Sequence, residues 1–368
     1  MRVALNAWFW DRAATGSRQY TLRLAEHLAK IAPDLELDLV RPGSSHTLNG
    51  QREGNLDKVA FEQIRFPRAC RSLGADVAHA PYWAPPLRPT IPTVVTVHDL
   101  IPLLLREYRG GPLARLYTAM VSVSVQKAAL TLTDSEASRR DILIHLGLAA
   151  ERVRVIPLAA GEEYTPTPSP SDAAVYARYA LPERYILYLG GFDARKNLAV
   201  VMRAYRWVGP TIGEECPLVI AGRLPEQDTS FAPDPRRLAL EEKLDERFVH
   251  FIGFVEEGDK PALYRRAAAF IFPSRYEGFG LPPLEAMACG APVVGSDAAS
   301  IPEVVGRAGV LLHPDDAEGM AGALIQLAID EDFRSKLSRR ALTQAAHFSW
   351  ERTAQETLRA YRDVMQAA

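Results

Sequence analysis

Short apolar segments alternate with longer amphipathic segments along the whole chain. The apolar segments predict two successive sets of strands, over residues 1–7, 35–42, 76–81, 93–99, 130–138 and 153–161, and then over 185–191, 216–222, 248–254, 268–274, 291–297 and 309–314. Strands that alternate with helices are typical of parallel sheets covered on both faces. The pattern therefore predicts an α/β protein with two Rossmann-like, doubly wound parallel-sheet domains that face a cleft.

The helices between the strands are predicted from apolar residues at helical spacing. Residues 20–32 place Leu22, Ala25, Leu28 and Ala29 on one face, and a longer helix is expected near residues 111–130. A helix of about two turns is expected to follow the glycines near residue 280. Residues 348–365 predict a last amphipathic helix.

Length favours two domains, because 368 residues exceed what one hydrophobic core usually organises. Proline-rich residues 164–173 predict a stiff, extended linker. We expect a Rossmann-like domain over residues 1–165, a linker over 166–184, a second Rossmann-like domain over 185–348, and a terminal helix over 349–368 that packs back toward the first domain. Ligands of such sheets bind beyond the carboxyl ends of the strands.

Composition narrows the classes of function. A net charge of -2 provides no field that would gather nucleic acid. The three cysteines, Cys70, Cys216 and Cys289, are widely spaced and do not suggest a disulfide framework or a metal cluster, which favours a reducing, cytoplasmic compartment. No apolar run is long enough for a membrane span, so we expect membrane contact to be peripheral if it occurs. No G-x-G-x-x-G motif follows the first strand, which disfavours NAD binding.

The strongest candidate chemistry lies in residues 275–290. Glu277 and Glu285 flank a bend that contains two glycines, and a Pro-Pro pair suits the first turn of the helix that follows. The free N–H groups and partial positive charge of a helix N-terminus favour a phosphate there. Because proline has no N–H, the donors are expected to be Gly280, Leu281 and Leu284.

This stretch carries a resemblance to a known family. Residues 277–297, EGFGLPPLEAMACGAPVVGSD, with the E-x7-E spacing of Glu277 and Glu285, resemble the signature of glycosyltransferase family 4. Four further segments are similar to family motifs, namely TGSRQYTLRLAEHL (15–28), VHDLIP (97–102), TDSEASRRDI (133–142) and YLGGFDARKNL (188–198). The family comprises retaining, nucleotide-sugar-dependent enzymes of GT-B fold, and this chain resembles its polysaccharide mannosyl- and rhamnosyl-type members.

The resemblance implies a role for individual residues. Glu285 would accept hydrogen bonds from the ribose, Glu277 would hold the donor sugar, and Lys196 would neutralise the diphosphate leaving group. His98 would hydrogen-bond the transferring sugar and completes the implied catalytic set with Glu277 and Lys196. The other implied donor-binding residues are Gly16, Arg195, Arg223, Phe254, Val255, Gly278, Phe279, Gly280 and Leu281. Many members carry an arginine where this chain has Gly191, so the division of phosphate contacts among Arg195, Lys196 and Arg223 stays open.

The implied reaction is transfer of a hexosyl unit from a nucleoside diphosphate sugar, with GDP-mannose slightly favoured. The acceptor would be a saccharide or lipid-linked sugar in surface polysaccharide or glycolipid synthesis, and it would enter from the first domain. The resemblance implies no metal and no organic cofactor. A D-x-D pair, Asp330 and Asp332, lies far along the chain from the glycine loops.

Other interpretations stay open at this point. A non-catalytic nucleotide-sugar binding protein, or another GT-B enzyme such as a sugar-nucleotide epimerase or a phosphorylase, would share the fold. Glu285 could simply cap its helix, Lys196 and Arg195 could form a solvated turn, and His98 could be a half-buried structural histidine. The donor base, acceptor, linkage and oligomeric state do not follow from the sequence.

Overall fold

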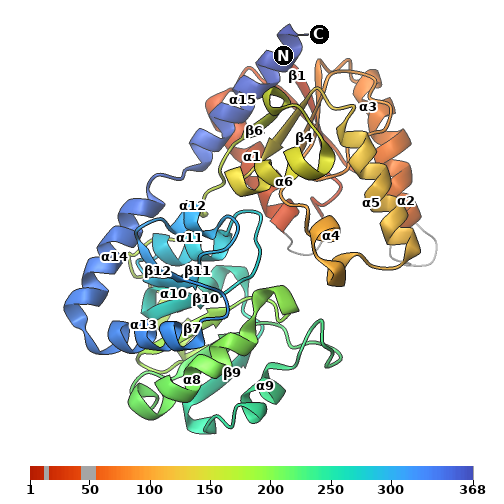
Figure 1. The fold of residues 1–368 in the computed structure, drawn as a ribbon. Coiled ribbons are helices and arrows are strands. Elements are labelled where there is room, and N and C mark those ends of the chain that lie inside the picture. Colours follow the sequence, from red (N-terminus) through yellow and green to blue (C-terminus); the bar gives the residue numbers. More distant parts are fainter. Residues whose placement is uncertain (12–15, 43–54, 368) are drawn as a thin grey trace. The chain divides into compact units, whose positions relative to one another are not determined.

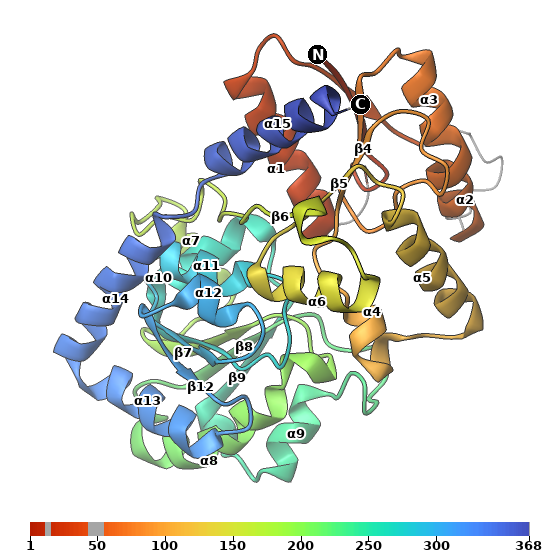
Figure 2. The same cartoon turned by 45° about the horizontal axis from the view of Figure 1, so that its top comes forward.

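The computed structural model describes residues 1–11, 16–42 and 55–367. The chain divides into two units, Met1–Leu158 with Ser349–Ala368, and Ala159–Phe348. Each unit contains a parallel sheet of six strands. Figures 1 and 2 show helices packed on both sheets. The predicted class, α/β with two doubly wound parallel sheets, is confirmed.

The first sheet is built from short, largely buried strands. They are β1 (Arg2–Asn6), β2 (Glu36–Val40), β3 (Val77–Ala80), β4 (Thr93–Thr96), β5 (Leu130–Thr133) and β6 (Val153–Val155). Their spatial order is β2-β1-β3-β4-β5-β6, so the connections change direction between β1 and β3. Loops that follow the strands on either side of such a switch point diverge and leave room for a ligand.

The helices of the first unit include one from the far end of the sequence. They are α1 (Gly16–Ile31), α2 (Asn55–Ala60), α3 (Phe66–Ser72), α4 (Ile101–Leu104), α5 (Pro112–Val125), α6 (Glu136–Leu146) and α15 (Trp350–Gln366). Ser349 caps α15 by accepting a hydrogen bond from the Arg352 N–H at 3.2 Å. Helix α15 packs along α1 and against β3 and β4 (Figure 2). The helical layer that covers the first sheet is therefore completed only by α15.

The second sheet has the strand order of a dinucleotide-binding fold. Its strands are β7 (Tyr185–Leu189), β8 (Leu218–Ala221), β9 (Val249–Gly253), β10 (Ala267–Phe272), β11 (Val293–Ser296) and β12 (Gly309–Leu312). The order β12-β11-β10-β7-β8-β9 places the switch point between β7 and β10. All residues of the two central strands are buried, as expected for strands covered on both faces.

Helices cover both faces of the second sheet. They are α7 (Asp172–Arg178), α8 (Leu198–Ile212), α9 (Pro235–Glu241), α10 (Lys260–Arg266), α11 (Leu281–Ala288), α12 (Ile301–Val305), α13 (Ala317–Ile329) and α14 (Glu331–Ala345). Helices α8 and α13 pack together over one face in a single apolar cluster that includes Ile186, Tyr188 and Ile271. Helices α10 and α11 contact each other and the central strands.

The structure corrects three details of the sequence prediction. Residues 166–184, predicted as a linker, lie in the second unit and contain α7, and the division between the units falls after Leu158. Asp172, at the start of α7, is bound by Arg265, a contact across 93 residues of sequence that fastens the proline-rich segment down. In α1, the buried row runs through Tyr20, Leu24 and Leu28, whereas Ala29 is exposed and Leu22 only half buried. The helical segment 55–72 was not predicted.

Two further observations concern the chain as a whole. Within the described residues, we find no helix with the length and apolar character needed to traverse a lipid bilayer. The three cysteines are free thiols, each buried.

Candidate active site

The loops after β7 and β10 are fastened to each other at the switch point of the second sheet. The Arg275 N–H donates to the Arg195 carbonyl at 2.8 Å. Asn197 has a left-handed backbone with φ 54, and its side-chain amide donates to the carbonyls of Pro273, at 3.3 Å, and Pro314, at 2.6 Å. These bonds hold residues 190–197 beside residues 273–280, so side chains from both loops meet.

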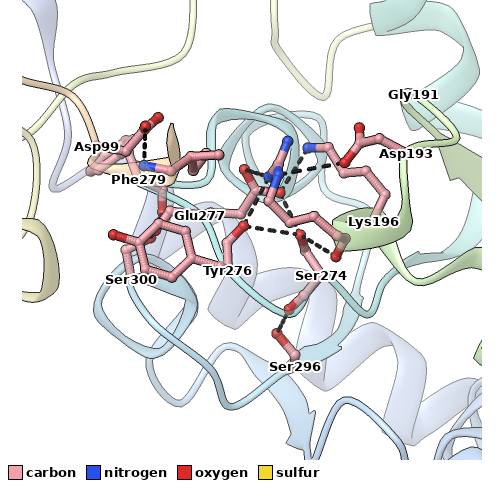
Figure 3. A network of polar contacts seen from close by, with 12 residues as sticks. Asp99, Gly191, Asp193, Lys196, Ser274, Tyr276, Glu277, Phe279, Ser296 and Ser300 are labelled. Atoms are coloured by element: carbon pink, nitrogen blue, oxygen red, sulfur yellow. Dashed lines mark hydrogen bonds and ion pairs between the residues drawn. The ribbon is translucent and has the colours of Figure 1, made fainter. Parts of the chain in front are cut away.

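Glu277 is the centre of the charged cluster that results (Figure 3). Lys196 Nζ lies 2.7 Å from its Oε1, and Arg195 Nη1 lies 2.6 Å from its Oε2. Ser274 Oγ donates to Oε1 at 2.5 Å. Burial alone would raise the pKa of Glu277, but the charges of Lys196 and Arg195 outweigh it and lower the pKa below its ordinary value. Glu277 is therefore an anion held between two cations.

The turn from Glu277 into α11 depends on a glycine. Gly280 has φ 117, and a Cβ at this position would approach Ile301 Cδ1 to 3.0 Å. Ser300 Oγ donates to the carbonyls of Phe279, at 2.6 Å, and Glu277, at 2.9 Å. The expected donation from the Leu284 amide is wrong, because that N–H already donates to the Gly280 carbonyl at 3.3 Å. Gly280 and Leu281 remain the expected backbone donors for a ligand.

Glu285 lies on α11 in a very different environment. Its residue is only 4% exposed, and the Tyr264 hydroxyl donates to its Oε2 at 3.4 Å. Burial raises the pKa of Glu285 to about 7, with the charge of Lys260 acting in the opposite direction. A carboxyl group with this pKa is partly protonated at neutral pH, unlike Glu277.

The segment after β9 offers one exposed aromatic ring. Phe254 is 48% exposed, and the Arg223 guanidinium lies 4.9 Å from the centre of its ring. Val255 next to it is buried at 4% exposure. The side chain of Phe254 is therefore available for stacking, whereas Val255 can contribute through its backbone.

His98 follows β4 in the first unit and is bound on both ring nitrogens. Nδ1 lies 2.7 Å from Asp134 Oδ2, and Nε2 lies 3.2 Å from the Pro81 carbonyl. Both partners accept hydrogen bonds, so both nitrogens must carry a proton. Burial would lower the pKa of His98, but Asp134 outweighs burial and raises the pKa above its ordinary value. His98 is therefore an imidazolium paired with a buried carboxylate.

A second histidine of the same unit has the opposite character. His79 on β3 is fully buried, with Nδ1 2.7 Å from the Tyr361 hydroxyl and Nε2 2.9 Å from Thr96 Oγ1. Thr96 Oγ1 also bonds the Tyr20 hydroxyl at 3.0 Å. Burial lowers the pKa of His79 to about 3, so it stays neutral. This network joins α15 to the sheet.

The remaining predicted residue, Gly16, begins α1 and is exposed. A Cβ on it would meet no described atom within 4 Å, and residues 12–15 before it lie outside the described residues.

Sequence reasoning missed Asp134, Ser274 and Ser300. Asp134 lies in the quoted segment TDSEASRRDI, so its place after a strand was the available signal, whereas the two serines become relevant only through the turn they hold.

Comparisons with known proteins identify the family of the chain. A family model described as Glycosyltransferase Family 4 matches residues 14–160, and one described as Glycosyl transferases group 1 matches residues 178–344. The chain is 31% identical to the O-antigen chain mannosyltransferase B of Escherichia coli, over 95% of this chain and 96% of that protein. It is also 33% identical to the serotype-specific mannosyltransferase WbdA of Escherichia coli over 75% of this chain. The matched residues cover only 34% of WbdA, which is a longer protein.

Solved structures support the fold. HepE of Anabaena, in complex with UDP-glucose, superposes with a TM-score of 0.70 at 18% identity, covering 100% of both chains. The two Rossmann-like units therefore have the GT-B fold of these solved structures, and the family models and the relative matched over nearly its whole length define the protein as a glycosyltransferase. The chain belongs to the group 1 glycosyltransferases of family 4.

Proposed function

We propose that this glycosyltransferase moves a mannosyl unit from GDP-mannose to a saccharide or lipid-linked acceptor in surface polysaccharide or glycolipid synthesis. The proposal is supported by the two mannosyltransferase relatives, one of which is matched over nearly its whole length. The observation that carries the donor site is the pairing of Lys196 and Arg195 with Glu277 at the switch point of the second sheet. UDP-glucose in HepE supports a nucleoside diphosphate sugar as the class of donor.

The donor diphosphate would be held by the cations of this cluster. Lys196 uses one of its three N–H donors on Glu277, which leaves two for phosphate oxygens. Arg195 supplies a second cation, and Arg223 beside Phe254 is a third candidate. The amides of Gly280 and Leu281 at the start of α11 add the partial positive charge of a helix N-terminus.

The other parts of the donor would bind around this centre. Glu277 would accept hydrogen bonds from the sugar hydroxyls, with Gly278 and Phe279 contributing backbone groups. Glu285 would accept the vicinal ribose hydroxyls, which it does best as a carboxylate. Phe254 would stack on the base while the Val255 backbone contacts it. Gly16 would let the chain before α1 approach the diphosphate or the acceptor.

The reaction we propose retains the configuration of the transferred sugar. The bond from the anomeric carbon to the β-phosphate oxygen breaks, and the acceptor oxygen forms the new glycosidic bond on the same face. The leaving phosphate takes the proton of the acceptor hydroxyl, so no protein base is required. Lys196 and Arg195 stabilise the charge that grows on the phosphate. His98 would donate its Nε2–H, which bonds the Pro81 carbonyl at 3.2 Å in the structure, to the transferring sugar instead.

A donor panel tests the proposal. Thermal unfolding with GDP-mannose, UDP-glucose, ADP-glucose and dTDP-rhamnose should show the largest rise in Tm with GDP-mannose, because a ligand that binds only the folded protein stabilises it by mass action. Transfer from GDP-mannose to a synthetic mannoside, followed by NMR of the product, then reports the anomeric configuration. Binding without any transfer or donor hydrolysis would favour the non-catalytic alternative, and an inverted product would exclude the retaining reaction.

We also propose peripheral contact with the inner face of a membrane through α5. Leu113 and Leu116 are 83% and 67% exposed, and Arg115 between them is exposed as well. Exposed leucines beside basic residues suit the boundary of an anionic bilayer. Flotation with phosphatidylcholine vesicles, with and without phosphatidylglycerol, should show binding that Leu113→Glu abolishes. Unchanged flotation of this variant would contradict the assignment of α5.

A further inference from the structure

A cavity of about 480 Å³ in the second unit lies at the amino ends of the strands, whereas the proposed donor site lies at their carboxyl ends. Arg184 directly precedes β7, and Arg265 and Arg266 directly precede β10, whereas the donor loops follow the same two strands. Because parallel strands share one direction, all their amino ends lie at one end of the sheet and all their carboxyl ends at the other. Residues of α14 complete the lining, including Arg334 and Arg339. We call these five arginines and their cavity the arginine basin.

Carboxylates offset only part of the charge of the arginine basin. Of the lining residues, Glu331 alone is acidic, and its side chain is 74% exposed while it pairs with Arg334. Asp172, just outside the lining, is buried and binds Arg265, with Nε 2.8 Å from Oδ2. Asp330 uses its side chain to cap α14 by accepting the Phe333 N–H at 2.9 Å. Five guanidinium groups therefore face two paired carboxylates.

Two of the arginines are held close together by one backbone carbonyl group. The guanidinium groups of Arg184 and Arg334 both donate to the Ala328 carbonyl near the end of α13. Burial lowers the pKa of Arg334, and the charge of Arg184 lowers it further. This contact explains how the end of α13 is capped, but it leaves like charges adjacent, which costs free energy unless an anion joins them.

Arg266 and Arg339, two other arginines of the basin, are not paired with a carboxylate in any contact that the described residues show. Arg266 donates from Nε to the Glu183 carbonyl at 2.9 Å, and its guanidinium lies 4.3 Å from the centre of the Tyr176 ring. Within the described part of the chain, the Arg339 side chain makes no hydrogen bond or ion pair, and it is exposed at the rim. Ser335 and Ser338, also on α14, add hydroxyl groups to the lining.

We propose that the arginine basin binds a small anion that carries two or more phosphate groups. Guanidinium groups match the oxygens of phosphate in paired hydrogen bonds, and an excess of several positive charges calls for more than one anionic group. The lining contains no aromatic side chain that could stack on a base, so the phosphates and not a nucleoside provide the recognition. A bound anion would bridge α10, α14 and the first residues of β7 and β10, which stabilises the second unit.

Inorganic diphosphate is the probe that tests this site. The full chain carries the Lys196→Ala substitution, because diphosphate is also expected to bind at the donor edge. In this background, calorimetric titration at constant ionic strength should show a remaining diphosphate site, and Arg339→Gln should weaken it about tenfold, the loss expected for one charge-assisted pair. Arg340→Gln is the matched control, since Arg340 is the exposed neighbour on the same helix and does not line the cavity.

Hydrogen exchange supplies an independent reading of where the anion binds. Diphosphate should slow amide exchange in residues 331–339 of the Lys196→Ala chain, and inorganic monophosphate should do so less. Equal affinities for the Arg339→Gln and Arg340→Gln chains would overturn the proposal. The same holds if exchange in residues 331–339 is unchanged at saturating diphosphate. Neither outcome bears on the glycosyltransferase assignment, because the basin lies apart from Glu277 and its cations.

Discussion

The candidate site of each unit contains two residues of the same type, of which one is charged and the other is neutral or partly neutral. In the first unit, His98 is an imidazolium beside Asp134, whereas His79 is neutral between two hydroxyl groups. In the second unit, Glu277 is an anion between Lys196 and Arg195, whereas Glu285 is bound by tyrosine hydroxyl groups, including that of Tyr264 at 3.4 Å. All four residues are largely shielded from solvent, so burial alone does not decide the charge. A partner of opposite charge does.

The largest expected effect comes from removing the carboxylate of the charged glutamate. Glu277→Ala should lower kcat/KM by about 10² or more, because it removes contacts to the donor sugar and releases Lys196 and Arg195 from their positions. Steady-state transfer from GDP-mannose measures this. Lys196→Ala should act in the same way by weakening the hold on the diphosphate.

A lysine elsewhere provides the control for this prediction. Lys336 is exposed on α14 and is not part of the Glu277 cluster, so Lys336→Ala should leave kcat/KM within about twofold. If Lys196→Ala retained full turnover and full affinity for GDP, the assignment of the diphosphate to this cluster would be wrong.

The next effect concerns the glutamate that tends to be neutral. Glu285→Gln should raise the free energy of unfolding at pH 8 by about 3 kcal/mol, since the shift of its pKa to about 7 makes the ionised form costly in the fold. Below the unfolded pKa near 4.5, Glu285 is protonated in both states, so the variant gains nothing there. Between that pH and about 7 the unfolded chain binds fewer protons, and the stability of the natural protein falls as pH rises.

Denaturant unfolding of both proteins from pH 5 to pH 8 checks this prediction. The affinity for GDP, measured over the same pH range, provides a second test. If Glu285 accepts the ribose hydroxyls as a carboxylate, GDP affinity in the natural protein should increase as pH rises through 7, and Glu285→Gln should remove that dependence. A stability gain that is the same at pH 5 and pH 8 would mean that Glu285 does not titrate in this range.

The charged histidine should respond to loss of its partner. Asp134→Asn removes the carboxylate that raises the pKa of His98, so the imidazolium should be lost at lower pH than in the natural protein. We expect kcat to fall about tenfold at pH 8 and the alkaline limb of the kcat profile to move to lower pH. A uniform fall in kcat with an unchanged profile would instead indicate that Asp134 only holds the loop.

The smallest effect is expected at the neutral histidine. Tyr361→Phe removes the hydroxyl that binds His79 Nδ1 and should lower the free energy of unfolding by about 1 kcal/mol. Because His79 does not titrate near neutral pH, the kcat profile of this variant should keep its shape. A displaced profile would show that the His79 network communicates with His98.

The sequence predicted the fold better than it predicted these charge states. Apolar runs located every strand of both sheets, and the motif around Glu277 located the turn into α11, because these features are local in sequence. The partner of each titratable group is not local. Asp134 lies 36 residues from His98, and Tyr361 lies 282 residues from His79, so only the folded chain shows which histidine is charged. The helix in the supposed linker was missed for the same reason, because Arg265 holds its first residue.

The position of α15 affects how the protein is made. The second unit is one uninterrupted stretch of chain, so it can fold as soon as residue 348 has left the ribosome. The first unit begins to emerge earlier but is finished later, because the face of β3 and β4 that α15 contacts stays open until α15 is synthesised. The nascent first unit therefore exposes His79 and its neighbours throughout translation of the second. Premature termination before residue 349 would leave one unit complete and the other open to aggregation.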